Sequence, residues 1–165
     1  MYDTLFLDRD GVINHKLEGR YVTNFNEFTF INKSDFAIKK LSKIFHRILI
    51  VTNQQGIGKG IMTVKDLEQL HSLMENALSC EKKYIDKIYF CPHLDIENCN
   101  CRKPNTGMIN QAIADFPEID CKNSYLIGDS DSDIEAGNRM NLNTVKVDNE
   151  YTLAKWTAEL MSVIE

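Results

Sequence analysis

The sequence predicts an α/β fold in which helices cover both faces of a central parallel sheet. Short apolar runs recur along the chain, and segments with apolar residues at helical spacing separate them. Strands buried on both faces read as continuous apolar runs, which is typical of parallel sheets between helix layers. Polar residues directly follow three of these runs. In an open parallel sheet, the carboxyl ends of the strands form the ligand crevice.

The expected strands alternate with expected helices from one end of the chain to the other. The strands are predicted at residues 4–7, 47–52, 87–90, 124–128 and 144–147. A first helix carries the apolar stripe of residues 37–45, with Ser34 as its N-cap. A second begins at about Val64, where Thr63 and Asp66 resemble a capping box. Further helices are expected at residues 108–116, 134–140 and 153–163.

One domain is expected to span residues 1–165, because this length supports a single sizeable core. Repeats, low-complexity tracts and linkers are absent from the sequence. Residues from about 14 to 33 show no clear periodicity and are too many for a plain connection between a strand and a helix. We expect this segment to form a flap or hairpin over one end of the sheet.

Composition excludes several functional classes. The net charge of −5 argues against a broad nucleic-acid-binding surface. No apolar run approaches the length of a membrane span, and the first residues do not resemble a secretory signal. A cytoplasmic, reducing setting is therefore expected, in which five cysteines are not a disulfide framework. Without a long amphipathic extension or heptad run, a monomer is the default expectation.

Acidic side chains and a hydroxyl group follow the predicted strands. Asp8 and Asp10 come after the first strand, Thr52 ends the second, and residues 128–133 (GDSDSD) follow the fourth. Each acid alone is explained equally well as a helix cap or a turn former. Together they would repel one another in one crevice unless a cation bound there. Asp8, Asp129 and a backbone carbonyl suit the oxygen ligands of Mg²⁺.

Four motifs resemble those of the haloacid dehalogenase (HAD) superfamily of phosphotransferases, in the same order. They are DRDGV from Asp8, the strand-terminal Thr52, Lys103 before a proline, and GDSDSD. The resemblance implies a Rossmann-like fold. It also implies that Asp8 attacks phosphorus to form an aspartyl-phosphate, and that Asp10 acts as general acid and then as general base.

The same resemblance implies the remaining roles in the site. Thr52 and the backbone N–H of Asn53 would hold phosphate oxygens, and Lys103 would supply positive charge to phosphate and nucleophile. Mg²⁺ would be held by Asp8, the backbone carbonyl of Asp10, and Asp129. Asp133 would either orient metal-bound water or cap the following helix.

The spacing leaves no room for a large cap domain. Within the superfamily, the segments FLDRDGVIN, VTNQQGIGKG, CPH and CNCRKPNTGM resemble the heptose 1,7-bisphosphate 7-phosphatases, which are capless. Related histidinol-phosphate phosphatases share several of these elements. Five residues separate His93 from Cys99, which matches the histidinol-phosphate group, and Lys59 stands where the heptose group commonly has arginine. The flap and the GIGKG and NTGM segments favour a heptose bisphosphate, with histidinol phosphate as the alternative.

Three cysteines and a histidine gather between residues 91 and 101. Cys91, His93, Cys99 and Cys101 form a Cys₃His set that suits zinc. Four protein ligands leave no open position, so this zinc would be structural. The alternative is a group of reduced cysteines without metal. Cys80 and Cys121 are isolated and are expected to be packing or surface thiols.

Arg102 adjoins the last expected zinc ligand. It is expected to contact a second phosphate or a carboxylate, and the alternative is a surface ion pair. Arg20 and Lys59 are further candidates for contact with an anionic substrate. His46 and His71 are expected to be packing or surface residues, whereas no role follows from the sequence for His15.

Two non-enzymatic classes are alternatives to a phosphatase. Response-regulator receivers share clustered acids, a strand-end threonine and a Lys-Pro pair, but their phosphoacceptor ends the third strand. Here the order of motifs differs, and a receiver needs no zinc loop. A zinc-stabilised interaction module would leave Asp8, Asp10, Thr52 and Asp129 unexplained.

Overall fold

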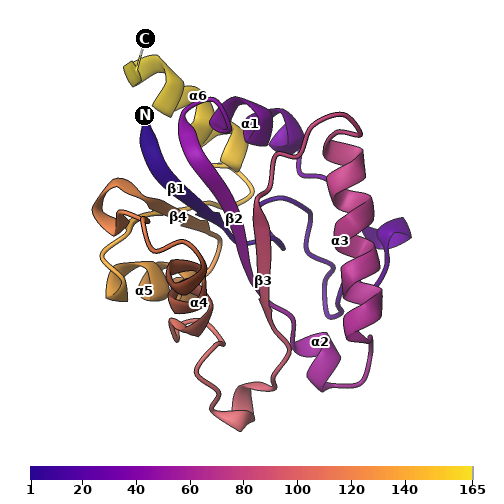
Figure 1. The fold of residues 1–165 in the computed structure, drawn as a ribbon. Helices are drawn as coiled ribbons and strands as arrows, with labels where there is room; N and C mark the ends of the chain where they lie inside the picture. The colour runs from indigo at the N-terminus through magenta and orange to yellow at the C-terminus, as the bar shows by residue number, and fades with distance from the viewer. Residues whose placement is uncertain (165) are drawn as a thin grey trace.

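The computed structural model describes residues 1–164 and contains one five-stranded sheet. All neighbouring strands are parallel, in the order β3-β2-β1-β4-β5 (Figure 1). The predicted fold class is thereby confirmed. The strands are β1 (Tyr2–Leu7), β2 (Phe45–Asn53), β3 (Lys87–Cys91), β4 (Tyr125–Gly128) and β5 (Asn143–Lys146).

Helices cover both faces of this sheet. The helices are α1 (Ser34–Leu41), α2 (Gln55–Gly58), α3 (Val64–Leu78), α4 (Gly107–Asp115), α5 (Asp131–Arg139) and α6 (Leu153–Ile164). Apolar residues of α1, α3 and α6 pack with Leu5 and Leu7 of β1, whereas those of α4 and α5 pack with Phe6. This division follows from the strand period of two, because successive side chains point to opposite faces. All three β1 residues are fully buried.

Two details of the first predicted helix were wrong. Ser34 is the first residue of α1 rather than its N-cap, and its hydroxyl donates to the carbonyl of Ile13 at 2.7 Å. Lys33 holds the N-cap position with a left-handed φ of 62°. The helix ends at Leu41, and Phe45 begins β2. The apolar stripe continues from the helix into the adjacent buried strand, so the sequence pattern did not show the boundary between them.

The capping box predicted at the second long helix is confirmed. The backbone N–H of Asp66 donates to Thr63 Oγ1 at 3.1 Å, and the backbone N–H of Thr63 donates to Asp66 Oδ2 at 2.8 Å. Two N-terminal donors of α3 are therefore satisfied by side chains. α5 begins earlier than the predicted residue 134, at Asp131, because Ser130 forms a capping box with Asp133.

Residues 14–33, here called the flap, connect β1 to α1 without forming a β-hairpin. Their only helical turn is the 3₁₀ segment Phe25–Glu27, and isolated bridges join Asn14 to Asp10 and to Phe30. Phe25 and Phe30 are among the partly buried residues that pack against the core on the α3 side of the sheet. The flap is thus held by its aromatic residues. Some of its other side chains, among them Lys16 and Leu17, lie at the carboxyl ends of the strands.

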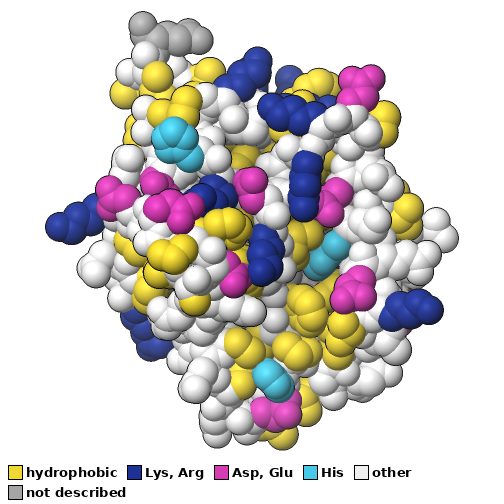
Figure 2. Space-filling view, in the orientation of Figure 1, with side chains coloured by type: hydrophobic (Ala, Val, Ile, Leu, Met, Phe, Trp, Pro, Cys, Tyr) yellow, Lys and Arg dark blue, Asp and Glu magenta, His cyan; other side chains and the backbone are white. Residues whose placement is uncertain are grey.

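The surface carries charges of both signs. Figure 2 shows Lys and Arg side chains interspersed with Asp and Glu side chains on the face seen in Figure 1, in agreement with the net charge of −5. Within residues 1–164, no helix has the length and apolarity needed to cross a bilayer.

Candidate active site

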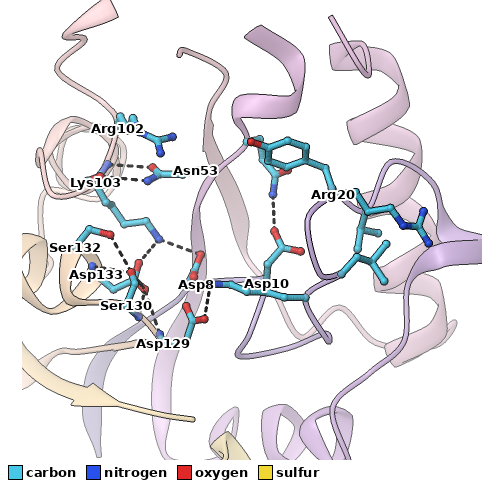
Figure 3. Close-up of a pocket in the computed structure, with 15 residues that line it drawn as sticks. Asp8, Asp10, Arg20, Asn53, Arg102, Lys103, Asp129, Ser130, Ser132 and Asp133 are labelled. Atoms are coloured by element: carbon cyan, nitrogen blue, oxygen red, sulfur yellow. Dashed lines mark hydrogen bonds and ion pairs between the residues drawn. The ribbon is translucent and has the colours of Figure 1, made fainter. Parts of the chain in front are cut away.

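A pocket of about 310 Å³ lies at the carboxyl ends of the strands (Figure 3). Carboxylates reach it from the ends of β1 and β4, cations reach it from the segment before α4, and the flap closes one side. Its charged lining residues are Asp8, Asp10, Lys16, Arg20, Arg102, Lys103, Asp129 and Asp133. The topology therefore brings together most of the site residues predicted from separate motifs.

Lys103 lies at the base of this pocket and is 4 % exposed. Its ammonium is 3.0 Å from Asp8 Oδ1 and 2.5 Å from Asp133 Oδ1, and it donates to the carbonyl of Val51 at 2.7 Å. Burial alone would lower the pKa of Lys103, but Asp8 and Asp133 outweigh it and the pKa is raised. Lys103 is therefore a permanent cation beside Asp8.

Asp8 lies beside the Lys103 ammonium together with other carboxylates. Burial raises the pKa of Asp8 to about 8; Lys103 opposes this rise, while Asp133, Asp129 and Asp10 add to it. Burial is therefore the main cause of the raised pKa of Asp8, and the neighbouring carboxylates add to it.

Asp133 has both oxygens engaged. Oδ2 accepts from the backbone N–H groups of Asp129 and Ser130, each at 3.1 Å, and from the Ser130 hydroxyl at 2.8 Å. Oδ1 faces Lys103. Of the two roles expected for Asp133, the structure shows the helix cap, and the same side chain also fixes the Lys103 ammonium.

Asp10 has a different environment from Asp8. Arg9 NH2 donates to both of its oxygens, Asn14 Nδ2 donates to Oδ1 at 2.9 Å, and Gln54 Nε2 donates to Oδ2 at 3.1 Å. Burial alone would raise the pKa of Asp10, but Arg9 and these hydrogen bonds outweigh it and lower the pKa below its ordinary value. Asp10 is therefore ionised in the free protein, and it lines the pocket (Figure 3).

Asp129 lies at the edge of the pocket beside the flap. Its Oδ2 is 2.6 Å from the ammonium of Lys16, and its buried Oδ1 has no hydrogen-bond partner within residues 1–164. A Cβ atom at Gly11 would lie 2.2 Å from Asp129 Oδ2, and Gly11 has a φ of +84°. Both the backbone conformation and the close approach of this carboxylate therefore require glycine there.

The two residues predicted to hold phosphate differ in their access to the pocket. Thr52 is fully buried, its hydroxyl accepts from Gln54 Nε2 at 2.9 Å, and it does not line the pocket. Asn53 does line the pocket, but its side-chain amide pairs with the backbone of Lys103, with distances of 3.0 and 3.2 Å. Asn53 thus ties β2 to the segment that carries Lys103.

The three other predicted cations differ in their access to the pocket. Arg102 lines it, and its buried NH1 has no hydrogen-bond partner among the described residues, while Nε is 3.4 Å from Asp95. Arg20 also lines the pocket, but its guanidinium pairs with Glu27 and points away from the carboxylates (Figure 3). Lys59 does not line it and lies over the ring of Tyr21.

Several lining residues were not predicted from the sequence. They include Lys16, Leu17, Tyr21 and Val22 of the flap, and Gln54, Ser130 and Ser132. Gln54 directly follows the predicted strand-end pair, so its place in the chain could have revealed it. The flap residues have no local signal, because their approach to the pocket depends on how the whole segment packs.

The Cys₃His set converges at one end of the loop between β3 and α4. Sγ of Cys91 lies 3.5 Å from Sγ of Cys99 and 2.8 Å from Sγ of Cys101, and Nδ1 of His93 lies 3.2 Å from Sγ of Cys101. One ligand atom from each of the four residues lies within 4.8 Å of the others, so they could hold one metal ion. Burial works to raise the pKa of Cys99, but the N–H of Arg102 and the neighbouring thiols lower it to about 7.

Comparison with known proteins identifies the family of this chain. The D-glycero-alpha-D-manno-heptose-1,7-bisphosphate 7-phosphatase of Mycobacterium tuberculosis is 39 % identical over 131 residues, covering 79 % of this chain and 69 % of the relative. The D-glycero-beta-D-manno-heptose-1,7-bisphosphate 7-phosphatase of Helicobacter pylori is 42 % identical over 135 residues, covering 81 % and 76 %.

The chain belongs to the heptose-bisphosphate phosphatase family.

Two further comparisons agree with this assignment. Residues 100–162 match the HAD-hydrolase-like family model. The crystal structure of D,D-heptose 1,7-bisphosphate phosphatase from B. bronchiseptica, complexed with magnesium and phosphate, superposes with a TM-score of 0.88 at 27 % identity. The match covers 98 % of this chain and 99 % of that one. The predicted family resemblance, fold and phosphatase activity are therefore confirmed. The protein is a HAD-type phosphatase.

The residues of this phosphatase fit a divalent cation beside Asp8. One carboxylate oxygen each from Asp8, Asp129 and Asp133 lies within 4.8 Å of the others. Oδ1 of Asp129 is buried without a partner among the described residues, and burial, with smaller contributions from Asp133, Asp129 and Asp10, raises the pKa of Asp8. Because both Asp133 oxygens are engaged within the protein, Asp8 and Asp129 are the two side chains that would hold the ion.

We predict that stabilisation of the protein by Mg²⁺ increases with pH. The pKa of Asp8 is raised from 3.8 to about 8, so in metal-free protein the neutral carboxyl contributes stability that is lost as pH rises through that value. Cation binding requires the ionised form. The rise in Tm caused by MgCl₂ over EDTA should therefore be larger at about pH 8.5 than at about pH 6.

Asp8→Asn is the matched control for this measurement. It removes the titrating carboxyl, so in EDTA its Tm should exceed that of the wild type at the higher pH, and the Mg²⁺ effect should be small at both pH values. An equal Mg²⁺ effect for wild type at both pH values would contradict the prediction.

Proposed function

We propose that this phosphatase removes the 7-phosphate of D-glycero-D-manno-heptose 1,7-bisphosphate with the help of Mg²⁺. The observation that carries the proposal is a pocket with two separate charge centres. Asp8, Lys103 and Asp129 form a site for the phosphate that reacts, and Arg102 offers a buried guanidinium NH1 without a partner for a second anion. The relatives named for this reaction support the same substrate.

In the first step, a carboxylate oxygen of Asp8 attacks phosphorus and the bond from phosphorus to the sugar oxygen breaks. Asp10 donates a proton to that departing oxygen, so the sugar leaves as an alcohol. Because Asp10 is ionised in the free protein, it must take up this proton when the substrate phosphate brings negative charge into the pocket. Lys103 lies on the opposite side of Asp8 and offsets charge at the nucleophile.

In the second step, water attacks the aspartyl-phosphate. Asp10, now a carboxylate, accepts a proton from that water, and the bond between phosphorus and the Asp8 oxygen breaks to release inorganic phosphate. Mg²⁺ held by Asp8 and Asp129, with the backbone carbonyl of Asp10, would neutralise charge that the two lysines leave uncompensated. Lys16 would have to move from Asp129 for the ion to bind there.

We also propose that Cys91, His93, Cys99 and Cys101 hold a structural zinc ion. Their donor atoms converge, and thiolate with imidazole is the ligand set that zinc prefers. Cys99 Sγ accepts the backbone N–H of Arg102 at 3.3 Å, so the cluster is linked directly to the two active-site cations that follow it. Thiolate ligands must remain reduced, which supports a cytoplasmic setting.

We predict that heptose 1,7-bisphosphate is hydrolysed with a higher kcat/KM than histidinol phosphate. Histidinol phosphate brings a positively charged amine, which Arg102 and Lys16 would repel, whereas the bisphosphate brings a second anion. Both anomers of the heptose are tested with Mg²⁺, and phosphate release is measured. Asp8→Asn should abolish release; a preference for histidinol phosphate, or residual turnover by this variant, would overturn the proposal.

We predict that Arg102→Ala weakens binding of the bisphosphate selectively. A hydrogen bond between charged groups contributes about 1.5–3 kcal/mol, so KM should rise roughly tenfold or more. For heptose 7-phosphate, which lacks the second phosphate, KM should change little. Arg20→Ala is the control, because that guanidinium already pairs with Glu27. Equal effects of Arg102→Ala on both substrates would contradict a second phosphate site.

We predict one zinc ion per chain in protein purified without chelator. Cys99→Ser should lose the ion, and the loop should become sensitive to limited proteolysis because metal binding stabilises its folded form. Cys80→Ser is the matched control, since Cys80 is exposed and outside the cluster. Elemental analysis gives the zinc content; absence of zinc from the wild type would refute the assignment.

A further inference from the structure

His71 of α3 is buried in an otherwise apolar stripe. It is 6 % exposed, and its neighbours in this stripe are Leu67, Leu70 and Met74. Its Nε2 lies 3.0 Å from NH1 of Arg9. An arginine only donates, so Nε2 accepts and the imidazole is the neutral tautomer with its proton on Nδ1. Burial, assisted by Arg9, lowers the pKa of His71 to about 3, which agrees with that state.

Arg9 links this histidine to the active site. Its side chain is fully buried, and NH2 donates to Asp10 at 2.9 Å for Oδ1 and 3.2 Å for Oδ2. The guanidinium is a rigid plane, so contacts at both NH1 and NH2 fix its orientation. Without His71, NH1 would lose its partner in the interior, and the plane could rotate about its remaining contact with Asp10.

The position of Asp10 depends on the orientation of that plane. Arg9 is the one donor that contacts both of its oxygens within the described residues, while Asn14 and Gln54 each contact one. Asp10 lines the pocket, where a proton must pass from its carboxyl group to the oxygen of the leaving group. A hydrogen bond to a reacting atom requires placement to within a few tenths of an ångström.

We propose that His71 is a positioning residue for the hydrolytic reaction, which holds Asp10 in its productive orientation through Arg9. A purely structural role is the competing explanation, since buried polar groups are commonly satisfied by hydrogen bonds. The two explanations differ in their consequences for chemistry. The proposal rests on the function proposed above for Asp10 as the group that protonates the leaving oxygen.

The leaving group of the substrate separates these explanations. A sugar alkoxide is a poor leaving group and needs the proton from Asp10, whereas p-nitrophenolate departs without it. The ratio of kcat/KM for the heptose phosphate to that for p-nitrophenyl phosphate therefore reports proton donation in the first step. A general loss of folded protein lowers both values equally and leaves this ratio unchanged.

The experiment measures this ratio in intact, Mg²⁺-loaded protein for five variants. His71→Leu removes the acceptor for Arg9, and His71→Gln restores one. Leu70→Ala is the control for destabilisation of α3, because Leu70 is buried and apolar. Arg9→Lys keeps the charge but cannot contact both partners, and it tests the same link if His71→Leu does not fold. Asp10→Asn removes the proton donor itself.

We expect His71→Leu and Arg9→Lys to lower the ratio by about tenfold, a part of the contribution of a general acid. His71→Gln should recover most of this loss, and Leu70→Ala should retain the wild-type ratio. The inference is overturned if Asp10→Asn lowers the ratio and neither His71→Leu nor Arg9→Lys does, or if Leu70→Ala lowers it equally. If Asp10→Asn leaves the ratio unchanged, the role proposed for Asp10 fails, and the inference fails with it.

Discussion

The buried ammonium of Lys103 is the interaction on which the active site depends. An unpaired charge in the interior costs several kcal/mol, so its position requires carboxylates around it. Asp8 from the end of β1, Asp133 from α5 and the carbonyl of Val51 in β2 supply these contacts. One side chain thus connects three elements of the fold. One of these carboxylates, Asp8, also lies close to Asp129, and these two side chains would hold a divalent cation.

The loop that carries the Cys₃His cluster and the sheet contribute separately to placing this ammonium. The side-chain amide of Asn53 pairs with the backbone of Lys103, and the Cys99 sulfur accepts the N–H of Arg102. Strand β2 therefore contacts the loop on one side, and the Cys₃His cluster contacts it on the other. The residues that would hold magnesium and those proposed to hold zinc do not overlap.

The sequence predicted the parts of the site that topology brings together. Apolar runs indicated parallel strands, and the carboxyl ends of such strands lie at one edge, so Asp8 and Asp129 were expected to meet there. The Cys₃His set was visible because its ligands are close in the chain. Ser34 was misplaced, whereas the role of Thr52 in phosphate binding stays a prediction. The Ser34 hydroxyl donates to Ile13, a tertiary partner that no local pattern indicates, whereas the Thr52 hydroxyl accepts from Gln54, two residues away.

Contacts between distant segments account for what the sequence could not show. Lys16 approaches Asp129 only because the flap packs as it does, and Arg9 meets His71 across 62 residues of chain. An isolated histidine in an apolar helical stripe looks like a packing residue, and its hydrogen bond to a buried arginine is visible only in three dimensions.

The connection between β3 and α4 has a consequence for the evolution of this family. If Cys91, His93, Cys99 and Cys101 hold zinc as proposed, the ion ties together both ends of the stretch between His93 and Cys99. The length of this stretch could then vary while Lys103 and the groups around Asp8 keep their positions.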